Sequence, residues 1–508
     1  MKKKNSVMTI PAVAAGKLTR LILRKTGRGG TAIPGIVGLR LSPGVLTAVS
    51  RGMKIIVVTG TNGKTTTCNM IEHALSSADH DCLRDKSGAN LLHGIASDLI
   101  CSTDWRGRPL HDYAVIECDE AALKQVVPFL RPKAIVVTNL FSDQVDRYGG
   151  VQNTLKEIRT GVERSPGSVL VLNADEPLSA SLAIGVPNKV VWYGMDAAVG
   201  EQGNVDLSDA GSCPKCGGAY EYDYHIYAHL GGYRCPECGY RHPDPDVSVL
   251  SIDEMTPAGS RVRMQFRPLG SRKAAADQNP ISPSGADTGS AAQQAAAGLT
   301  AADDGSTASQ KGQPAAARTQ EVMIALPAVY NVYNAAATVA AIRALRLPAR
   351  EAVEGLATVR SAFGRMETFD LHGIRLQMIL VKNPAGCNQA FSYVTGFDED
   401  FSAVLCLNDR TGDGHDISWI ENTDYEKLVS DPHLRHLYVG GDRAQDLYAR
   451  LQRAGAAEDR TELVTDYSLL VQKLKEETCP VFLLPNYTAM MELRDALSPE
   501  TGAKDFWE

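Results

Sequence analysis

Long apolar runs are missing from this 508-residue sequence. No stretch approaches the ~18–20 consecutive apolar residues that a helix needs to cross a bilayer, which excludes a simple transmembrane protein. Positive charge is not in excess, because the formal net charge is −7, and this excludes a nucleic-acid-binding protein with a broadly basic surface. Hydrophobic residues make up 44% and charged residues 22%, as in ordinary soluble enzymes. The length predicts two or three domains.

Acidic residues are absent from the start of the chain, where none precedes Glu72. Residues 1–50 form a basic segment, and residues 16–28 mix cations with leucine and isoleucine, which predicts a short basic amphipathic helix. Two interpretations stay open: the helix rests on an anionic membrane surface, or it is a solvated or docked helix. Lys17 and Arg20 interrupt any apolar region of a signal peptide, so secretion is not expected.

Aromatic residues are absent from residues 271–320, which are rich in Ala, Gly, Ser, Asp and Gln. Such a segment cannot bury enough apolar area to fold, and we expect a disordered insert over about 268–320. Its flanks, 261–266 and 321–326, alternate apolar and polar residues as strands do. The insert is therefore predicted to be the expanded tip of a β-hairpin.

Cysteines divide into two groups. Seven are scattered singly, as expected for reduced thiols in a cytoplasmic protein. The other four form two CPxCG pairs with eighteen residues between them: Cys213, Cys216, Cys235 and Cys238. This spacing predicts a tetrahedral Zn²⁺ site in a ribbon over about 205–245, with an iron site of the same geometry as the alternative.

The ribbon is expected to be structural. Four thiolates would leave no coordination position open for water or substrate. Tyr220, Tyr222 and Tyr224 alternate between the two pairs as in a strand. A nucleic-acid-binding ribbon is the rival interpretation, but the loop lacks a strong cluster of Lys and Arg.

Apolar runs that end in polar residues predict the fold. Helical spacing separates them, which is the pattern of an α/β domain with a mainly parallel sheet, and ligands of such sheets lie beyond the carboxyl ends of the strands. The expected strands of a central domain, residues 51–350, are 54–60, 113–117, 134–139 and 168–172. Those of a second, smaller α/β domain, residues 360–508, are 376–381, 403–407, 436–439 and 481–484.

A glycine-rich turn follows the first of these strands. Its glycines would let backbone N–H groups approach phosphate oxygens, at the amino end of the next helix. Lys64 would bridge the β- and γ-phosphates and the Thr65 hydroxyl would hold Mg²⁺. Only two residues separate the glycines, against four in the strict P-loop, and a glycine-rich turn with a chance lysine is the plain alternative. The predicted ATP-binding residues of the turn are Gly60, Thr61, Asn62, Gly63, Lys64, Thr65 and Thr66.

The shortened turn with its three threonines resembles the Mur ligase and folylpolyglutamate synthase superfamily. That resemblance implies a Mur-type central P-loop domain, here with an inserted zinc ribbon, and a smaller Rossmann-like carboxyl-terminal domain. It implies that Glu117 holds a second Mg²⁺, and that residues 138–149 form the polar segment after the next strand. Asn334 would approach the nucleotide from the helix at 329–336, and Arg365 in the segment 363–367 would point at ATP.

The carboxyl-terminal motifs are more specific. Residues 381–389 and 407–419, together with the ribbon, resemble the MurT-type synthetase subunits of lipid II isoglutaminyl synthases. The resemblance covers nearly the whole chain except 271–320, and 27–31 fits it too. It implies ATP-dependent amidation of the α-carboxyl of D-glutamate in lipid II, through an acyl phosphate. Because lipid II is membrane-bound, the enzyme would work in the cytoplasm at the inner face of the membrane.

The ammonia in that family comes from a separate GatD-type glutaminase subunit in a heterodimer. Cys387 and Cys406 have no nucleophile-elbow context, which fits dependence on such a partner. We expect Asp416, and Asp413 second, to be the carboxylate that positions ammonia or accepts its proton. An Asx-type turn in a glycine-rich loop is the structural alternative.

Two rival functions stay open. One is a ligase that adds an amino acid in place of ammonia and needs no partner. The other is a nucleotide-gated binding module that does not turn over substrate. The intact set of Lys64, Thr65 and Glu117 weighs against the second.

Overall fold

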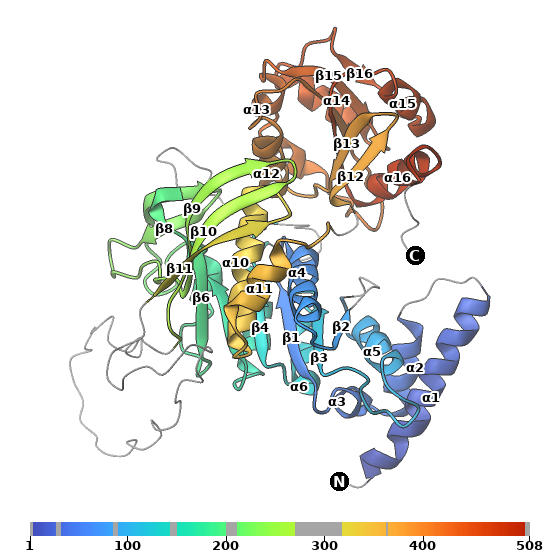
Figure 1. Cartoon of the computed structure of the whole chain (residues 1–508), viewed down its shortest axis with the longest axis vertical. Coiled ribbons are helices and arrows are strands. Elements are labelled where there is room, and N and C mark those ends of the chain that lie inside the picture. Colours follow the sequence, from blue (N-terminus) through green and yellow to red (C-terminus); the bar gives the residue numbers. More distant parts are fainter. Residues whose placement is uncertain are drawn as a thin grey trace.

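The chain folds into three regions (Figure 1). A computed structural model describes residues 4–26, 32–84, 90–142, 150–199, 211–269, 317–361 and 364–502. Several expected segments lie wholly or partly outside these residues: 27–31, 143–149, the start of the ribbon, most of the insert, and Phe363. Within the described residues, no helix is long and apolar enough to cross a membrane.

The central domain is built on a nine-stranded sheet of order β11-β10-β9-β6-β5-β4-β1-β3-β2. The seven strands from β9 to β2 run parallel to one another, whereas β10 pairs antiparallel with β9. Their bounds are β1 Lys54–Thr59, β2 Cys82–Arg84, β3 Tyr113–Glu117, β4 Ala134–Val137, β5 Val169–Asn173, β6 Val190–Met195 and β9 Val247–Thr256. The predicted strands of this domain are all present, so the apolar runs correctly indicated a parallel sheet.

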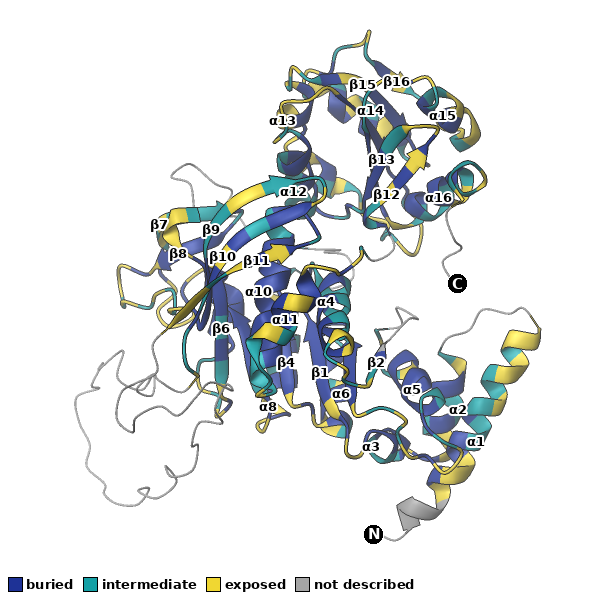
Figure 2. Cartoon of the chain, viewed as in Figure 1, coloured by how far each residue is buried: buried dark blue, intermediate teal, exposed yellow. Residues whose placement is uncertain are grey.

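Helices cover both faces of this sheet, which explains why its strands are apolar throughout. On β1, Ile56 and Val58 pack on one side and Ile55 and Val57 on the other. The first side is covered by α4 Lys64–Ser77, α10 Val329–Ala344 and α11 Ala349–Leu356. The second is covered by α5 Leu92–Cys101, α6 Leu123–Leu130, α8 Val151–Glu163 and α9 Pro177–Ser181. Figure 2 shows the buried strands between these layers.

A β-hairpin extends the sheet, as the alternating flanks of the insert predict. Strand β10 Gly259–Phe266 pairs antiparallel with β11 Arg318–Ile324, with Val262 opposite Val322. Both valines are fully buried. The expected insert, however, reaches too far: Arg318, Thr319 and Gln320 belong to β11 and pair with β10. Composition alone therefore placed the end of the insert three residues late.

The two cysteine pairs flank a small antiparallel ribbon between η1 Ala197–Val199 and β9. Its strands are β7 Glu221–Tyr227 and β8 Leu230–Arg234. The expected alternation holds for Tyr222 and Tyr224, whereas Tyr220 immediately precedes β7.

The carboxyl-terminal domain has a six-stranded sheet of order β12-β13-β17-β14-β15-β16. Only β12 is antiparallel to its neighbour. The strands are β12 Arg365–Leu371, β13 Ile374–Ile379, β14 Phe401–Cys406, β15 Leu434–Gly440, β16 Thr461–Leu463 and β17 Val481–Pro485. The helices are α12 Pro384–Val394, η3 Ser418–Asn422, α13 Tyr425–Val429, α14 Ala444–Arg453, α15 Tyr467–Leu474 and α16 Tyr487–Thr501.

An amino-terminal helical layer packs beside the central domain. It consists of α1 Lys4–Lys25, α2 Ile33–Leu41 and α3 Val45–Val49, with α5 between them and the sheet. Helix α1 is longer than the expected helix of 16–28, and Ala12 and Val13 on its inner side are fully buried. A Cβ on Gly38 of α2 would lie 2.4 Å from Ile100 of α5, so glycine allows this close helix packing. The inner side of α1 is therefore docked on the neighbouring helices, as one of the two interpretations of this segment predicted.

Candidate active site

The glycine-rich turn lies between β1 and the amino end of α4. Gly60 and Gly63 have φ angles of +120° and +81°, which glycine adopts without strain. A Cβ on Gly63 would lie 2.3 Å from the side-chain oxygen of Asn334. The turn therefore requires glycine both for its backbone conformation and for its contact with α10.

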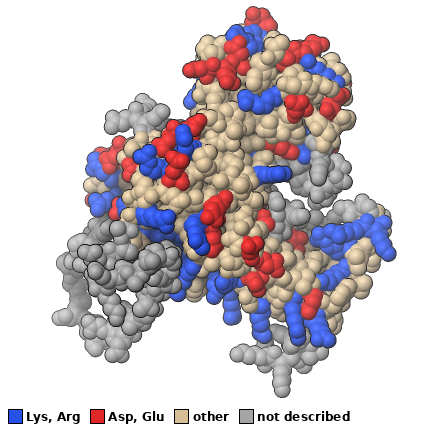
Figure 3. All heavy atoms as spheres, in the orientation of Figure 1, with Lys and Arg blue, Asp and Glu red and all other residues tan. Residues whose placement is uncertain are grey.

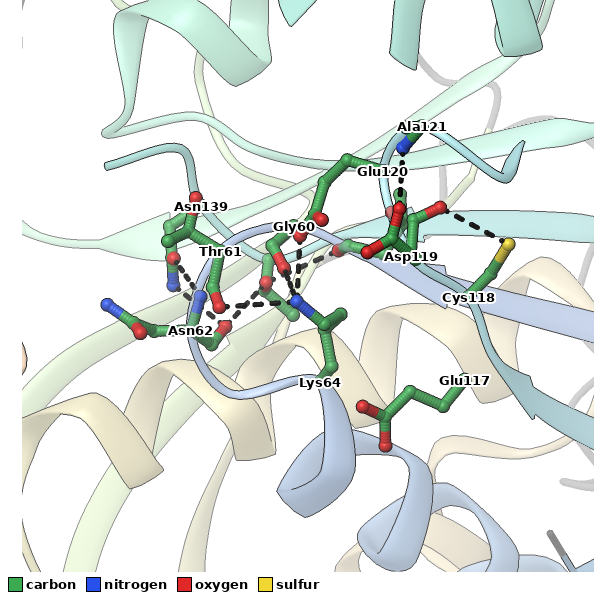
Figure 4. Close-up of polar contacts among 12 residues, drawn as sticks. Gly60, Thr61, Asn62, Lys64, Glu117, Cys118, Asp119, Glu120, Ala121 and Asn139 are labelled. Atoms are coloured by element: carbon green, nitrogen blue, oxygen red, sulfur yellow. Dashed lines mark hydrogen bonds and ion pairs between the residues drawn. The ribbon is translucent and has the colours of Figure 1, made fainter. Parts of the chain in front are cut away.

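Lys64 is the first residue of α4, and its ammonium group reaches back to the turn. Its Nζ is 2.5 Å from the carbonyl oxygen of Gly60 and 2.7 Å from Oε1 of Glu120, and both charged side chains are nearly buried. Figure 4 shows the ammonium group between the turn and the acidic segment after β3. Glu120 was not among the predicted site residues. Its position in the acidic run that follows β3, three residues after Glu117, was the available signal.

Thr65 and Glu117 form a second polar contact at the same sheet edge. The Thr65 hydroxyl donates to Oε2 of Glu117 over 2.7 Å. A threonine oxygen and a carboxylate oxygen are hard ligands of the kind that Mg²⁺ prefers. These two residues, chosen from the sequence as Mg²⁺ ligands, thus come together next to the phosphate turn.

Asparagines hold the turn in shape. The backbone N–H of Asn62 donates to Oδ1 of Asn139 over 2.9 Å, and that of Thr61 donates to the Asn139 carbonyl over 2.8 Å. On the other side, the Asn334 side chain accepts from the Thr67 hydroxyl and donates to Asn331. Asn139 and Asn334 are both buried, so they fix the turn between the sheet edge and α10.

A cleft opens between the central and carboxyl-terminal domains in front of this turn. It is open to solvent, and residues of both domains line it. Among the predicted nucleotide-binding residues, its lining includes Asn62, Gly63, Thr66, Asn334 and Arg365.

The far wall of the cleft carries residues that sequence reasoning did not select. Asn383 exchanges hydrogen bonds with the Asn62 side chain, over 3.1 Å and 3.4 Å, and also caps α12 by accepting from the Gly386 N–H. Lys382, which precedes it, lines the cleft as well. The carboxyl-terminal domain thus contacts the phosphate turn directly.

The four predicted metal ligands converge. Their sulfur atoms all lie within 4.8 Å of one another, and the closest pairs, Cys213 with Cys238 and Cys216 with Cys235, are 3.4 Å apart. Four thiolates at the usual Zn–S distance of about 2.3 Å from one ion would be about 3.8 Å apart. The cluster therefore fits a tetrahedral zinc ion.

The ribbon also forms part of the cleft wall, which the sequence did not predict. Tyr227, at the end of β7, lines the cleft, as does Phe141 after β4, and their rings stack with centroids 6.1 Å apart. Behind them, His229 and Glu176 are fully buried, with 3.1 Å between the His229 ring nitrogen and a Glu176 carboxylate oxygen. The Phe141 ring meets the His229 ring edge-on at 5.0 Å. A change in the ribbon can therefore reach the cleft.

A second buried carboxylate ties the ribbon to α10. Asp175 accepts a 2.6 Å hydrogen bond from the Tyr333 hydroxyl and lies 2.6 Å from His242 of the ribbon segment. Tyr333 precedes Asn334, which contacts the phosphate turn. The ribbon is thus anchored in the part of the domain that shapes the turn.

Asp413 and Asp416, predicted for the amidation step, line a small cavity of the carboxyl-terminal domain. Asp413 accepts hydrogen bonds from the backbone and the hydroxyl of Thr488, and burial raises its pKa. Asp416 is exposed and accepts a 2.8 Å hydrogen bond from the Ser418 N–H. The hydrogen bonds from Ser418 lower the pKa of Asp416.

The hydrogen bond from the Ser418 N–H to the Asp416 side chain forms an Asx-type turn. Such a turn was the alternative to a role of Asp416 in the amidation step. Because Asp416 is exposed, it also remains accessible to a ligand. Lys382 lines both this cavity and the cleft. The two carboxylates therefore lie on the same side of the domain as the phosphate turn, next to the cleft.

Comparisons with known proteins agree with this arrangement. The model of the Mur ligase middle domain matches residues 58–226, and that of the MurT ligase C-terminal domain matches residues 380–490. The subunit of Streptococcus pneumoniae named lipid II isoglutaminyl synthase (glutamine-hydrolyzing) subunit MurT is 29% identical, over 97% of this chain and 98% of that protein. The subunit of the same name from Staphylococcus aureus is 28% identical, over 96% and 97%.

Solved structures give the same fold at lower identity. A pseudomurein peptide ligase type C from Methanothermus fervidus has a TM-score of 0.59 and 18% identity, covering 88% of this chain and 79% of that one. A UDP-N-acetylmuramoylalanyl-D-glutamyl-2,6-diaminopimelate–D-alanyl-D-alanyl ligase from Acinetobacter baumannii has a TM-score of 0.60 and 14% identity, covering 91% of this chain and 79% of that one. Because the likeness to the two subunits runs through the central and the carboxyl-terminal domain alike, the chain belongs to the MurT family of Mur-type ligases.

Proposed function

We propose that this chain is the synthetase subunit of a lipid II isoglutaminyl synthase. It uses ATP to convert the α-carboxyl of D-glutamate in lipid II into the amide of D-isoglutamine. The observation that carries the proposal is the full-length likeness to two subunits of that name, which spans the phosphate turn as well as the loop of Asp413 and Asp416.

The chemistry explains the need for the cleft. A carboxylate is a poor electrophile, so it first takes the γ-phosphoryl group of ATP, which gives an acyl phosphate and ADP. Ammonia then attacks the acyl carbon and forms the C–N bond of the amide. The bond between the acyl carbon and the phosphate oxygen breaks, inorganic phosphate leaves with the electron pair, and the nitrogen loses a proton. Lys64 would offset the negative charge that develops on the transferred phosphoryl group.

The other proposed roles follow the geometry of the cleft. Thr65 and Glu117 would hold Mg²⁺ against the phosphates. Asn334 and Arg365, on opposite sides of the cleft, would contact the nucleotide, as would the backbone of the turn from Gly60 to Gly63. The four cysteines would hold one zinc ion with a structural role, since no ligand position remains open.

Ammonia would come from a GatD-type glutaminase in a heterodimer. The name of both relatives includes glutamine hydrolysis, which requires a nucleophile. In this chain Cys387 and Cys406 are buried, and burial raises the pKa of Cys406 to about 12. Neither thiol is poised as a thiolate, so glutamine hydrolysis is assigned to the partner.

Asp416 is proposed to position ammonia or to accept its proton. Its carboxylate is exposed beside the cleft, and its lowered pKa keeps it ionised at neutral pH, as a proton acceptor must be. Asp413 is the second candidate, but both its carboxylate oxygens are engaged by Thr488.

Asp416→Asn is expected to reduce ADP release with lipid II, MgATP and ammonium by about 100-fold or more, while ATP affinity stays unchanged. Asp466→Asn is the matched control. The Asp466 carboxylate also accepts a 2.8 Å hydrogen bond from the N–H group two residues later, that of Ser468, but it caps α15 and does not line the cavity of Asp416. Coupled ADP detection and nucleotide titration measure the two effects. Equal activity of both variants would show that Asp416 is only a turn residue.

The same assay tests the amino-acid ligase, which is the second candidate. The Mur ligases of the fold comparison join peptides or amino acids, and this chain has their central domain. ADP release that requires a free amino acid in place of ammonium would favour this function over amidation.

A further inference from the structure

Helix α1 has two apolar sides, and only one of them is used inside the molecule. Its inner side, with Ala12, Val13 and Gly16, packs against α2 and α5. The outer side carries four large apolar residues that are about half exposed: Ile10 at 50%, Leu18 at 52%, Leu21 at 48% and Ile22 at 62%. We call these four residues the outer face of α1.

The four residues form one continuous surface. With about 100° between successive residues, Ile10, Leu21, Leu18 and Ile22 fall within an arc of about 120°. Figure 2 shows the exposed residues along this helix, and Figure 1 places α1 at the outer edge of the amino-terminal layer. A helix that is apolar on two sides is normally buried on both, but no segment among the residues that the structure describes covers the outer face.

The charged residues that α1 and α2 contribute around the outer face are all basic. Arg24 and Lys25 are exposed at the end of α1, and Lys17 lies one turn before Leu21, with its ammonium 5.5 Å from the centre of the Trp105 ring. No acidic residue precedes Glu72 in the sequence, so α1 and α2 contribute no carboxylate. The nearby Asp98 is paired with Arg20. Figure 3 shows basic side chains gathered over this end of the molecule.

The loop after α5 adds an aromatic residue to this surface. Trp105 is 56% exposed beside Lys17, and Arg106 and Arg108 follow it in the sequence. The carboxylate of Asp104, which precedes it, accepts hydrogen bonds from the backbone N–H groups of these two arginines. Tryptophan beside basic residues is typical of protein surfaces at the membrane–water interface.

We propose that the outer face of α1 docks on an anionic lipid bilayer. The apolar side chains enter the boundary between headgroups and acyl chains, and Arg24 and Lys25 contact the lipid phosphates. Charge complementarity favours a bilayer over a protein partner, because α1 and α2 contribute only cations and the one carboxylate of the Trp105 loop, Asp104, already accepts two backbone N–H groups. The inference goes beyond the proposed activity and does not depend on it.

Sedimentation of the full chain with lipid vesicles tests the proposal. We expect binding to vesicles of phosphatidylcholine with phosphatidylglycerol, weaker binding to phosphatidylcholine alone, and a further loss when salt is raised from about 0.1 to about 0.5 M. Leu18→Ser/Ile22→Ser should lower the partition coefficient at least about tenfold. The vesicles contain no lipid II, so failure here would not bear on catalysis.

Two further variants make the test specific. Met323→Ser/Leu469→Ser removes two equally exposed apolar residues from β11 and α15 and should bind as the unchanged chain does. Arg24→Glu/Lys25→Glu should abolish the preference for the anionic vesicles without altering the buried side of α1. Absence of vesicle binding, or equal binding by Leu18→Ser/Ile22→Ser, would overturn the proposal. So would loss of glutaminase association in that variant with vesicle binding intact, because the outer face would then cover a protein.

Discussion

Replacing Lys64 by methionine is expected to lower ATP-dependent turnover by about 100-fold to 1,000-fold, as when one group that stabilises transition-state charge is removed. The Lys64 ammonium is held between the Gly60 carbonyl and Glu120, next to the Thr65–Glu117 pair. The cations that line the cleft, Arg365 and Lys382, come from the carboxyl-terminal domain and not from the turn. Methionine keeps the length of the side chain but loses the charge. ADP release in the presence of lipid II and ammonium measures the effect.

Lys54→Met is the matched control. Lys54 begins β1, at the opposite end of the strand from the turn, and its ammonium donates to the Tyr113 hydroxyl. The same substitution there should leave turnover within about twofold of the unchanged chain, since surface changes away from a site have small effects. Similar turnover of Lys64→Met and Lys54→Met would contradict the role of the turn in phosphoryl transfer.

Replacing Cys235 by serine is expected to remove most of the bound zinc and to lower the midpoint of thermal unfolding by about 5 °C or more. Structural zinc contributes directly to folding free energy, and about 1 kcal/mol shifts the midpoint of a domain of this size by about 2–4 °C. ATP affinity should fall as well, because the ribbon supplies Tyr227 to the cleft and buries His229 against Glu176. Metal analysis, calorimetry and nucleotide titration measure the three effects.

Cys479→Ser controls for the loss of a thiol. Cys479 is half-buried in the carboxyl-terminal domain and hydrogen bonded to Ser402, far from the cluster in the sequence. It should keep one zinc ion per chain and its ATP affinity. If Cys235→Ser loses zinc but binds ATP normally, the ribbon only stabilises the fold. The contact through Tyr227 would then not couple zinc binding in the ribbon to ATP binding in the cleft.

Local patterns were sufficient to predict the main features of the fold. The apolar runs before Gly60 and Asn139 indicated parallel strands because both faces of the sheet are covered, and the alternation around the insert indicated the hairpin of β10 and β11. The CPxCG spacing brought four sulfurs to one point because each turn directs two of them. These are properties of short segments, which explains why one sequence reveals them.

Features that depend on distant segments were missed. Glu120 was not separated from its acidic neighbours, because the turn after β3 decides which carboxylate faces Lys64. Strand β12 was not recognised, because it completes a sheet whose next strand, β13, carries the stronger apolar pattern. The contact of His229 with Glu176 joins residues 53 positions apart, and no local pattern connects the ribbon with the nucleotide cleft.

The central claim is that ammonia is transferred to lipid II. Mass spectrometry of lipid II, incubated with this protein, MgATP and ammonium, tests it most directly, because ammonium replaces the glutaminase partner. The account predicts a product lighter by the difference between a hydroxyl and an amino group, formed together with ADP and absent with Lys64→Met. Lipid II of unchanged mass, or a heavier product that has gained a free amino acid, would contradict it.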